Sequence, residues 1–350
     1  MGAKLKTGMV GVGHFGGYRR ARMRETGLFE LAAAWDLNPK MLQLCERQDG
    51  ARPAGSFEEL LAMPGLEALV ISTGAKFHAD QIVAAAERGL HVFVEKPLCS
   101  TPGELSLILE TQRRTGVVIG VGHNDLRHDP VAQTTKRLID DGTLGRVATF
   151  EKTTAHSGGL KMDPGEWRAD PEKNPGGMLF QCGVHGVHEL CFYFGPVTHV
   201  TSMMRYDVHA TRTADVALCH LRFASGLVGT LNAYHVTPYR HTLSIFGTRG
   251  NLYRDERHFE EGTKLGLQVT KLDGGYEPIA PVPVEGEADL CGNLRGFHRA
   301  IREGGAPYPG LREAAHAVAV VFAAEASAKQ GGAPVAVEAF EAVKEFAAAK

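Results

Sequence analysis

The glycine-rich turn near the beginning of the chain constrains the fold more than any other feature of the sequence. Gly11, Gly13 and Gly16 directly follow a short apolar run and open an amphipathic run. In such a unit the first glycine permits a turn, the second lets the backbone approach a pyrophosphate, and the third lets a helix pack closely on a strand. The helix N-terminus adds N–H donors that favour phosphate groups. The pattern predicts a dinucleotide-binding site that includes His14 and Phe15.

Asp36 indicates which dinucleotide this site takes. It lies 20 residues after Gly16, at the end of the second apolar run. A carboxylate at this position accepts hydrogen bonds from the adenosine ribose, and its charge repels a 2′-phosphate. Leu37 and Asn38 offer no guanidinium that could replace that interaction. The sequence therefore favours NAD as the cofactor, with NADP as the alternative because Lys40 follows closely.

The first part of the chain alternates short apolar runs with amphipathic runs. The short runs are typical of strands covered on both faces, and the longer runs have helical periodicity. This alternation predicts an α/β fold in residues 1–125, a Rossmann domain with a doubly wound parallel sheet. The expected strands are 7–12, 29–34, 68–72, 91–94 and 117–121, and the expected helices are 18–26, 79–88 and 102–114.

The second part, residues 126–350, has a different pattern. Its strands follow one another without helices, which indicates an α+β domain with a largely antiparallel sheet. A helix with an apolar stripe from Leu311 to Ala326 is expected to pack on a core. The other face of the sheet stays open, so we expect a homo-oligomer, a dimer or tetramer, through this sheet. The expected strands are 146–153, 199–206, 216–223, 227–236 and 242–246, with a hairpin turn at 224–226.

The charge balance of the chain argues against several kinds of partner. Lys and Arg number 38 against 40 Asp and Glu, so a formal net charge of −2 offers no field for nucleic acid or an anionic membrane. No uncharged stretch approaches the roughly 20 apolar residues that cross a bilayer. The N-terminus shows no export signal, and we therefore expect a cytoplasmic protein.

The six cysteines predict neither a disulfide framework nor a zinc site, because no Cys-x-x-Cys pair occurs. Cys182, His185, His188 and Cys191 recur at every third residue. In a helix with a rise of roughly 1.5 Å per residue the two cysteine backbones lie about 13.5 Å apart, too far to share one ion. We expect no metal.

Glu95-Lys96-Pro97 ends the apolar run that begins at His91. Ligands of open parallel sheets bind beyond the carboxyl ends of the strands, so Lys96 is expected to face the ligand cleft. Pro97 restricts the backbone of Lys96 to an extended conformation, or the connecting bond to a cis form where the turn is tight.

Taken together, these segments resemble the Gfo/Idh/MocA family of NAD(P)-dependent oxidoreductases, which act mostly on sugars, inositols and related polyols. The similarity covers nearly the whole chain. It rests on Gly11–Gly16 with Asp36, on Glu95-Lys96-Pro97, on Gly122–Arg127, on Trp167-Arg168, and on Asn174–Gly177 followed by Gly183-Val184-His185. The Lys-Pro pair followed much later by Gly-x-His is its most specific part.

The resemblance implies a catalytic pair. Lys96 would contact the reacting hydroxyl and the nicotinamide side of the site, and His185 would take and return the hydroxyl proton. Removing hydride from a carbinol also releases its hydroxyl proton, and an imidazole that titrates near neutrality suits that proton. The Lys96 ammonium would stabilise the developing alkoxide. On the cofactor side the family pattern adds Thr73, His78 and Glu95.

Two positions depart from the family pattern. Gln181 stands where the family commonly has Asp, four residues before the histidine. An amide can orient a substrate hydroxyl but cannot take its proton, which favours His185 as the sole acid/base or a variant substrate. The two residues after Thr73 replace a Pro-Asn-like segment, so we assign no side-chain role to them.

Polar and aromatic residues are expected to shape a sugar pocket. Arg offers planar donors to hydroxyls, and Trp offers an apolar ring to C–H faces. His128 and His241 are expected to be structural or solvated. The substrate-binding candidates are His123, Asn124, Arg127, His156, Trp167, Arg168, Gln181, His185, Tyr234 and His235.

We expect reversible NAD-dependent oxidation of a secondary hydroxyl on a sugar, glycoside or cyclitol. Two alternatives stay open. In the first, transient oxidation permits elimination, as in NAD-dependent glycosidases, and turnover is redox-neutral. In the second, the chain is an NAD-binding sensor without catalysis, and the presence of both Lys96 and His185 argues against it.

Overall fold

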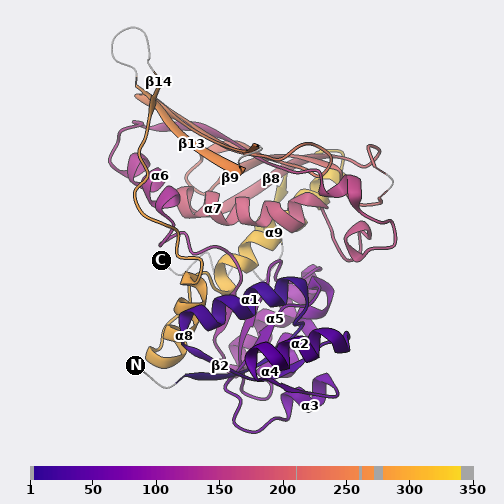
Figure 1. Ribbon diagram of the computed structural model, residues 1–350. Coiled ribbons are helices and arrows are strands. Elements are labelled where there is room, and N and C mark those ends of the chain that lie inside the picture. The colour runs from indigo at the N-terminus through magenta and orange to yellow at the C-terminus, as the bar shows by residue number, and fades with distance from the viewer. Residues whose placement is uncertain (1–3, 210, 260–261, 272–278, 340–350) are drawn as a thin grey trace. The chain divides into compact units, whose positions relative to one another are not determined.

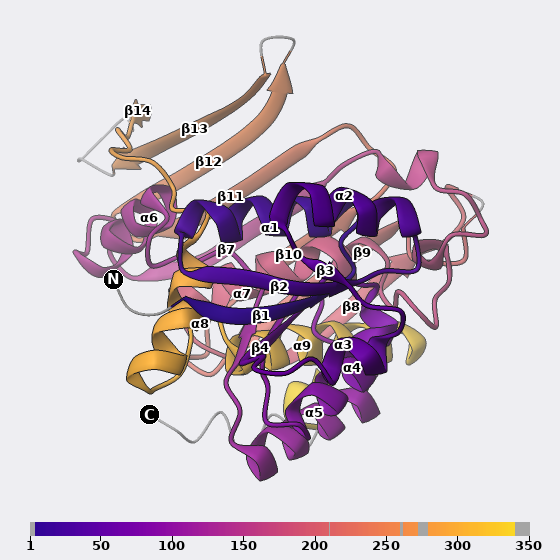
Figure 2. The same ribbon diagram turned by 60° about the horizontal axis from the view of Figure 1, so that its bottom comes forward.

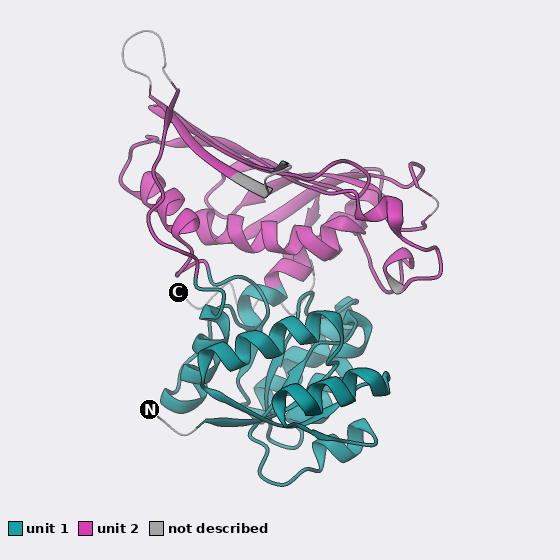
Figure 3. Ribbon diagram, in the orientation of Figure 1, with its two compact units in different colours: residues 1–125, 289–315 teal, residues 126–288, 316–350 magenta. Residues whose placement is uncertain are grey.

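A computed structural model describes residues 4–209, 211–259, 262–271 and 279–339. The chain divides into two compact units (Figure 3). Unit 1 comprises residues 1–125 and 289–315, and unit 2 comprises residues 126–288 and 316–350. Residues 289–315 lie beyond the division expected after residue 125, yet they fold with unit 1.

Unit 1 is built around a parallel sheet. Its strands are β1 (Leu5–Val10), β2 (Phe29–Trp35), β3 (Arg52–Pro53), β4 (Ala68–Ile71), β5 (His91–Val94) and β6 (Ile119–Val121). Its helices are α1 (His14–Thr26), α2 (Pro39–Asp49), α3 (Phe57–Leu61), α4 (His78–Ala86), α5 (Pro102–Thr115) and α8 (Gly292–Glu303). Helices α1 and α2 lie on one face of the sheet, and α3, α4 and α5 lie on the other (Figure 2).

The strand order of this sheet is β3-β2-β1-β4-β5-β6, and every described pairing is parallel. After β3, at one edge, the chain returns to β4 beside β1, so the strand order changes direction between β1 and β4. Doubly wound sheets bind ligands at such a switch point, beyond the carboxyl ends of the strands. The order confirms the expected Rossmann fold.

Local signals define the ends of the helices in unit 1. The side chains of Thr101 and Glu104 form a capping box at the start of α5, and Gly116 ends that helix with a φ of 69°. The apolar pattern does not predict α2. The ends of α2 nevertheless carry local helix signals, because Asn38 caps its start and Gly50 follows its end in the left-handed region.

Unit 2 contains a larger sheet with helices. Its strands are β7 (Val147–Ala155), β8 (Val197–Arg205), β9 (Val216–Phe223), β10 (Val228–Tyr234), β11 (Arg240–Gly247), β12 (Gly250–Phe259), β13 (Gly262–Lys271), β14 (Ile279–Pro281) and β15 (Val335–Ala336). Its helices are α6 (Pro130–Asp140), α7 (Val184–Phe194) and most of α9 (Leu311–Lys329). A π-helical turn, η4 (Leu179–Gly183), leads into α7.

The strand order in unit 2 is β14-β13-β12-β11-β7-β10-β9-β8-β15 over the described residues. Only the β7–β10 pairing among these is parallel. The largely antiparallel sheet expected for the second domain is therefore confirmed. Gly226 has a φ of 86° and closes the hairpin between β9 and β10 at the expected place.

The two faces of this sheet differ. Along β9 the side chains alternate, so that Leu221 and Phe223 are buried while His220 and Arg222 are exposed. Helices α6, α7 and α9 lie on the buried face, which we call the inner face (Figure 1). No helix of the described residues lies on the opposite, outer face (Figure 1).

Strands β12 and β13 are not predicted by the apolar pattern. The reason is visible in β12, where the charged run from Arg254 to Arg257 interrupts the alternation. Arg254 sits at a position of inner parity, directly opposite Leu243 of β11. Its burial depends on partners far away in the sequence, which a local pattern cannot reveal.

Candidate functional site

The glycine turn of unit 1 forms an open cradle. Gly11 has a φ of 79°, and a Cβ there would lie 2.7 Å from the carbonyl oxygen of Ser72. A Cβ on Gly16 would lie 2.2 Å from the carbonyl oxygen of Gly11, so both glycines are required by the fold itself. A Cβ on Gly13 would meet no described atom closer than 3.9 Å. The space beside Gly13 is therefore free for a ligand such as a pyrophosphate.

Asp36 joins the end of β2 to this turn. Its Oδ2 accepts a hydrogen bond of 2.7 Å from the Val12 amide, and its Oδ1 accepts one of 2.8 Å from the Asn38 amide. A carboxylate has lone pairs left for two further donors, such as ribose hydroxyls. The side chains of His14 and Phe15 are exposed at the first turn of α1.

His78 links the loops that follow β4 and β5. Its Nδ1 lies 2.9 Å from the carbonyl oxygen of Pro97, and its Nε2 lies 3.1 Å from that of Thr73. Burial lowers the pKa of His78, although the backbone contacts oppose this effect. Because both ring nitrogens face backbone carbonyls, His78 supports the two loops. The Thr73 hydroxyl donates to Gln81 Oε1 at 2.7 Å.

Glu95 is held inside unit 1. Its Oε1 accepts a hydrogen bond of 2.6 Å from Nε of Arg19, whose guanidinium lies over the Phe93 ring at 4.8 Å. A Cβ on Gly122 would come within 2.3 Å of Glu95 Oε2, so the strand end closes over this carboxylate. Lys96 follows, half-buried, and its bond to Pro97 is cis. Glu95 thus fixes the strand end that carries Lys96.

Asn293 of α8 completes this end of the sheet. Its Nδ2 donates to the carbonyl oxygen of His123 at 2.8 Å, and its Oδ1 lies 3.3 Å from NH1 of Arg19. Sequence reasoning missed this residue because it lies 170 positions after His123. The side chain of His123 is buried, and that of Asn124 is exposed.

A second set of candidates lies at strand ends in unit 2. His156 follows β7 and His235 follows β10, and their ring centroids are 5.1 Å apart. Nδ1 of His156 accepts a hydrogen bond of 2.9 Å from the Gly158 amide, which places the proton of the neutral ring on Nε2. That nitrogen lies 3.8 Å from Sγ of Cys182 in η4. Burial and the neighbouring His156 and Arg168 lower the pKa of His235 to about 4.

Gln181 and His185 lie where η4 passes into α7. Gln181 belongs to the π-helical turn, and His185 is the second residue of α7. Both side chains are half-buried. π-helical turns inside helices occur often at functional sites, because they change which residues face a neighbouring element.

The remaining candidates are more peripheral. Arg127 and Arg168 are exposed, as is His128, and Tyr234 is half-buried. The backbone of Arg168 is held by Asn174, whose Nδ2 donates to its carbonyl oxygen at 2.7 Å. Trp167 belongs to the short helix η3 (Trp167–Ala169), but its side chain lies outside the described part of the structure.

Sequence reasoning missed an ion cluster on the inner face of the sheet. Glu189 of α7 accepts hydrogen bonds from Lys152 Nζ at 2.5 Å and from Arg254 at 2.5 and 2.9 Å. The Tyr193 hydroxyl donates to the same carboxylate at 3.0 Å. Burial opposes ionisation of Glu189, but Arg254 and Lys152 outweigh it and hold its pKa well below the usual range.

A polar group on β11 and β12 extends this cluster. The Tyr239 hydroxyl donates to Glu256, and the His241 ring stacks on Tyr239 at a centroid distance of 4.5 Å. Burial, together with Lys152 and other nearby cations and despite Glu256, lowers the pKa of His241 to about 4. His241 is therefore a partly buried neutral imidazole. Polar or charged residues at inner positions of strands are the sequence feature that both groups share, although such a position reveals no role without its partner.

The described residues were compared with the arrangements that metal sites and disulfides require. No group of three or more His, Cys, Asp or Glu side chains could hold an ion there. The six cysteines are free thiols. None of the helices built from described residues has the length and apolar character that crossing a membrane requires.

Comparison with known proteins identifies the class. The family model for oxidoreductases with an NAD-binding Rossmann fold, GFO_IDH_MocA, matches residues 5–123, and the model for the GFO/IDH/MocA C-terminal domain matches residues 132–253. The chain belongs to the Gfo/Idh/MocA family of oxidoreductases, and unit 1 contains its NAD-binding domain.

Individual relatives agree with this assignment. The chain is 28% identical over 258 residues to scyllo-inositol 2-dehydrogenase (NAD(+)) of Bacillus subtilis, covering 71% of each chain. It is 25% identical over 336 residues to levoglucosan dehydrogenase of Pseudarthrobacter phenanthrenivorans, covering 79% of this chain and 82% of that one. The solved structure of a levoglucosan dehydrogenase in complex with NADH has the same fold, with a TM-score of 0.82 at 21% identity over 95% of this chain and 99% of the other.

Proposed function

We propose that this protein is an NAD-dependent dehydrogenase that oxidises a secondary hydroxyl of a sugar, glycoside or cyclitol. The observation that carries the proposal is the cradle at Gly13, where the fold requires glycines on both sides but leaves the middle position open. The relatives named above act on an inositol and on levoglucosan, and both are polyhydroxylated rings.

On the cofactor side, Gly11, Gly13 and Gly16 hold the pyrophosphate, and Asp36 accepts hydrogen bonds from the adenosine ribose. His14 and Phe15 line the first turn of α1 beside it. The Asp36 carboxylate favours NAD over NADP by charge repulsion of a 2′-phosphate. NAD, when bound, accepts the hydride that leaves the substrate carbon.

The chain's own residues handle the proton and the charge. In this proposal the Lys96 ammonium donates a hydrogen bond to the reacting hydroxyl and stabilises negative charge on that oxygen. The His185 imidazole accepts the hydroxyl proton and returns it in the reverse direction. Gln181 orients a neighbouring hydroxyl. His123, Asn124, Arg127, His156, Trp167, Arg168 and His235 are the proposed substrate contacts, whereas Tyr234 shares the outer side of β10 with Val228 and is not kept as one.

The proposal is tested by screening monosaccharides, inositols and anhydro sugars for substrate-dependent formation of NADH, with lactones tested in the reverse direction. Net accumulation of NADH with at least one polyol is the expected result. Cleavage of a glycoside without net reduction of the cofactor would instead support redox-neutral elimination, the reaction that Gln181 keeps open. Binding of NAD without turnover of any substrate would indicate a sensor.

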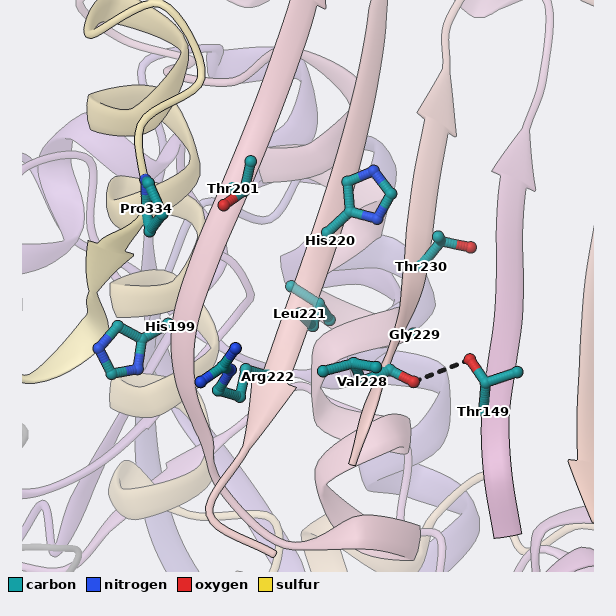
Figure 4. A pocket seen from close by; sticks show the side chains of 10 residues that line it. All are labelled: Thr149, His199, Thr201, His220, Leu221, Arg222, Val228, Gly229, Thr230 and Pro334. Atoms are coloured by element: carbon teal, nitrogen blue, oxygen red, sulfur yellow. Dashed lines mark hydrogen bonds between the residues drawn. The ribbon is translucent and has the colours of Figure 1, made fainter. Parts of the chain in front are cut away.

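We also propose that two copies of the chain associate through the outer face of the unit 2 sheet. Apolar side chains are exposed there, with Met203 70%, Val228 48% and Leu218 42% accessible. A groove of about 410 Å³ crosses this face between β8, β9 and β10. Figure 4 shows His199, His220 and Arg222 at the groove, where the Thr149 hydroxyl donates to the carbonyl oxygen of Val228 at 2.8 Å.

A second copy fits this face better than an unrelated partner because the face carries charges of both signs. Glu151 of β7 is acidic and Arg222 of β9 is basic, while Asp255 of β12 is paired within the chain with Arg240 and Arg257. A two-fold axis through the sheet can therefore oppose acidic and basic residues. Sedimentation should show a dimer or tetramer. Leu218→Glu together with Val228→Glu should yield monomers, and a wild-type monomer at micromolar concentration would refute the interface.

A further inference from the structure

We propose that the ion cluster of Lys152, Glu189 and Arg254 positions the imidazole of His185 and keeps it in the neutral, proton-accepting form. The inference rests on the proposed function of His185. It adds three positioning residues that lie outside the motifs of the sequence. None of the three is assigned contact with substrate or cofactor.

The register of the sheet places the two cations in one row. Leu231 of β10, Lys152 of β7, Leu243 of β11 and Arg254 of β12 are successive partners across the inner face. Leu231 and Leu243 are fully buried on either side of Lys152. Glu189 therefore bridges two cations that are separated by a whole strand, and it fixes α7 across the sheet.

Close contacts show which face of α7 lies against the sheet. Cys182 lies against His156 at the end of β7, and a Cβ on Gly186 would come within 3.0 Å of Lys152 Cε. Glu189 contacts Lys152 and Arg254. His185 is three residues after Cys182 and four before Glu189, so helical spacing places it on this same face.

The π-helical turn before α7 makes the contacts of Glu189 important for the position of His185. The wider π-helical turn changes which residues of the following helix face a neighbouring element. In α7 the Glu189 carboxylate holds one face against the sheet, since it accepts one hydrogen bond from Lys152 and two from Arg254. His185 lies one helical turn before Glu189, so a shift of Glu189 relative to the sheet would also shift the His185 imidazole.

The free energy of a buried ion triad indicates that Lys152, Glu189 and Arg254 do more than stabilise the fold. Lys152 is 5% exposed and Glu189 is 8% exposed. Replacing a buried ion pair or triad by apolar residues of similar volume is often neutral or stabilising. A purely structural tie between α7 and the sheet could therefore be made from apolar residues.

Charge balance explains the neutral form. A lone Glu189 carboxylate one turn away would favour the imidazolium form of His185. Lys152 and Arg254 compensate that charge. The other titratable groups toward this side of α7 are His241 and Glu256 on β11 and β12, His156, His235 and Tyr239 at strand ends, and Cys182, His188 and Tyr193 on η4 and α7 itself.

The decisive variant is the triple replacement Lys152→Met, Glu189→Leu and Arg254→Met, which removes the charges and keeps the volume. We expect it to fold, with a Tm lowered by no more than the loss of one buried acceptor, because the Tyr193 hydroxyl then lacks the Glu189 carboxylate. We also expect a kcat at least tenfold lower and an NAD dissociation constant within twofold of the wild type. Lys329→Met, which removes an exposed lysine paired with Glu325, is the matched control and should change none of these three quantities. A folded triple variant whose kcat stays within twofold would overturn the proposal.

Single variants separate position from charge. Lys152→Met removes one compensating cation, so the acid limb of the pH profile of kcat/KM should move to higher pH by roughly half a unit. Arg254→Lys keeps the charge and should retain that limb. An unmoved limb in Lys152→Met would refute the role in charge balance, because a merely structural role would lower Tm without shifting the profile.

A measurement without turnover separates this inference from the proposed function. The ring nitrogen-15 signals of His185, assigned with His185→Asn, report its tautomer in the intact protein. We expect a single neutral tautomer in the wild type and an averaged pattern in the triple variant. If no polyol is oxidised but this contrast is seen, the proposed function fails and the positioning role stands. Identical signals in both proteins would refute the positioning role.

Discussion

The two units build their functional surfaces in different ways. In unit 1 the ligand cradle is backbone, formed by Gly11, Gly13 and Gly16 within one turn of the chain. In unit 2 the proposed acid/base group is a side chain, that of His185, and the ion cluster proposed to position it meets across the sheet, with Glu189 lying 37 positions from Lys152 and 65 from Arg254. A backbone cradle suits a cofactor whose pyrophosphate never changes. The proposed substrate contacts of unit 2 are side chains that can change one at a time, which suits a variable substrate.

The strongest test of this division is Lys96, which lies in unit 1 but is proposed to act on the substrate. Lys96→Met should lower kcat by about 10² or more, because a positioned group in proton transfer contributes that much. The dissociation constant for NAD, measured by fluorescence titration, should stay within twofold. Loss of NAD binding in Lys96→Met would show that cofactor and substrate functions cannot be separated in this way.

The glycines of the cradle sharpen the comparison within unit 1. Gly16→Ala should destabilise unit 1 by about 3 kcal/mol, because its Cβ would overlap the backbone at Gly11. Gly13→Ala should destabilise unit 1 by only about 1 kcal/mol, because alanine is a poorer N-cap of α1 than glycine but its Cβ meets no close atom.

The main effect of Gly13→Ala should appear in NAD affinity rather than in the free energy of unfolding. Gly13→Ala should weaken NAD binding at least tenfold while its urea unfolding midpoint falls much less than that of Gly16→Ala. An alanine at position 13 that leaves NAD affinity unchanged would mean that the open space beside Gly13 is not the pyrophosphate site.

Asp36 offers a smaller change in cofactor preference. Asp36→Asn removes the charge but leaves an oxygen to accept from the Val12 amide. Removing repulsion of a 2′-phosphate should raise the NADP-to-NAD ratio of kcat/KM by roughly tenfold, or about 1.4 kcal/mol. Adding Lys40→Ala should reverse part of the gain if that lysine binds the phosphate. An unchanged ratio would refute the assigned role of Asp36.

Much of unit 1 could be predicted from sequence because its signals are local. The glycine turn, the buried strands β4 and β5 and the caps of α5 each depend on neighbours in the chain. The fold class and the family followed from them. The return of residues 289–315 could not be predicted this way, because Asn293 and Phe297 act only through contacts with distant residues.

Unit 2 shows the limit of local signals. The alternation of β9 and the turn at Gly226 were predictable, since both are periodic or short-range. Lys152 and Arg254 were not assigned a role, because a charged residue at an inner position is informative only once its partner is known. His241 was expected to be structural or solvated, and the structure gives it a ring contact and a buried nitrogen without a hydrogen-bond partner among the described groups.

The smallest expected effect is a pH dependence confined to unit 2. The pKa of His235 is lowered to about 4 in the folded chain, and an unfolded histidine titrates near 6.5. Between these values the unfolded state binds more protons, so this histidine's contribution to stability is complete above about pH 6.5 and is lost as the pH falls toward 4.

From pH 7 to 5.5 the free energy of unfolding should fall by about 1 kcal/mol through His235. Urea denaturation at both pH values should show a loss smaller by that amount in His235→Gln, whereas His128→Gln, which changes an exposed histidine, should behave as the wild type. Equal pH dependence in all three proteins would mean that His235 is hydrated and charged, and it would then not be one of the neutral imidazoles of unit 2.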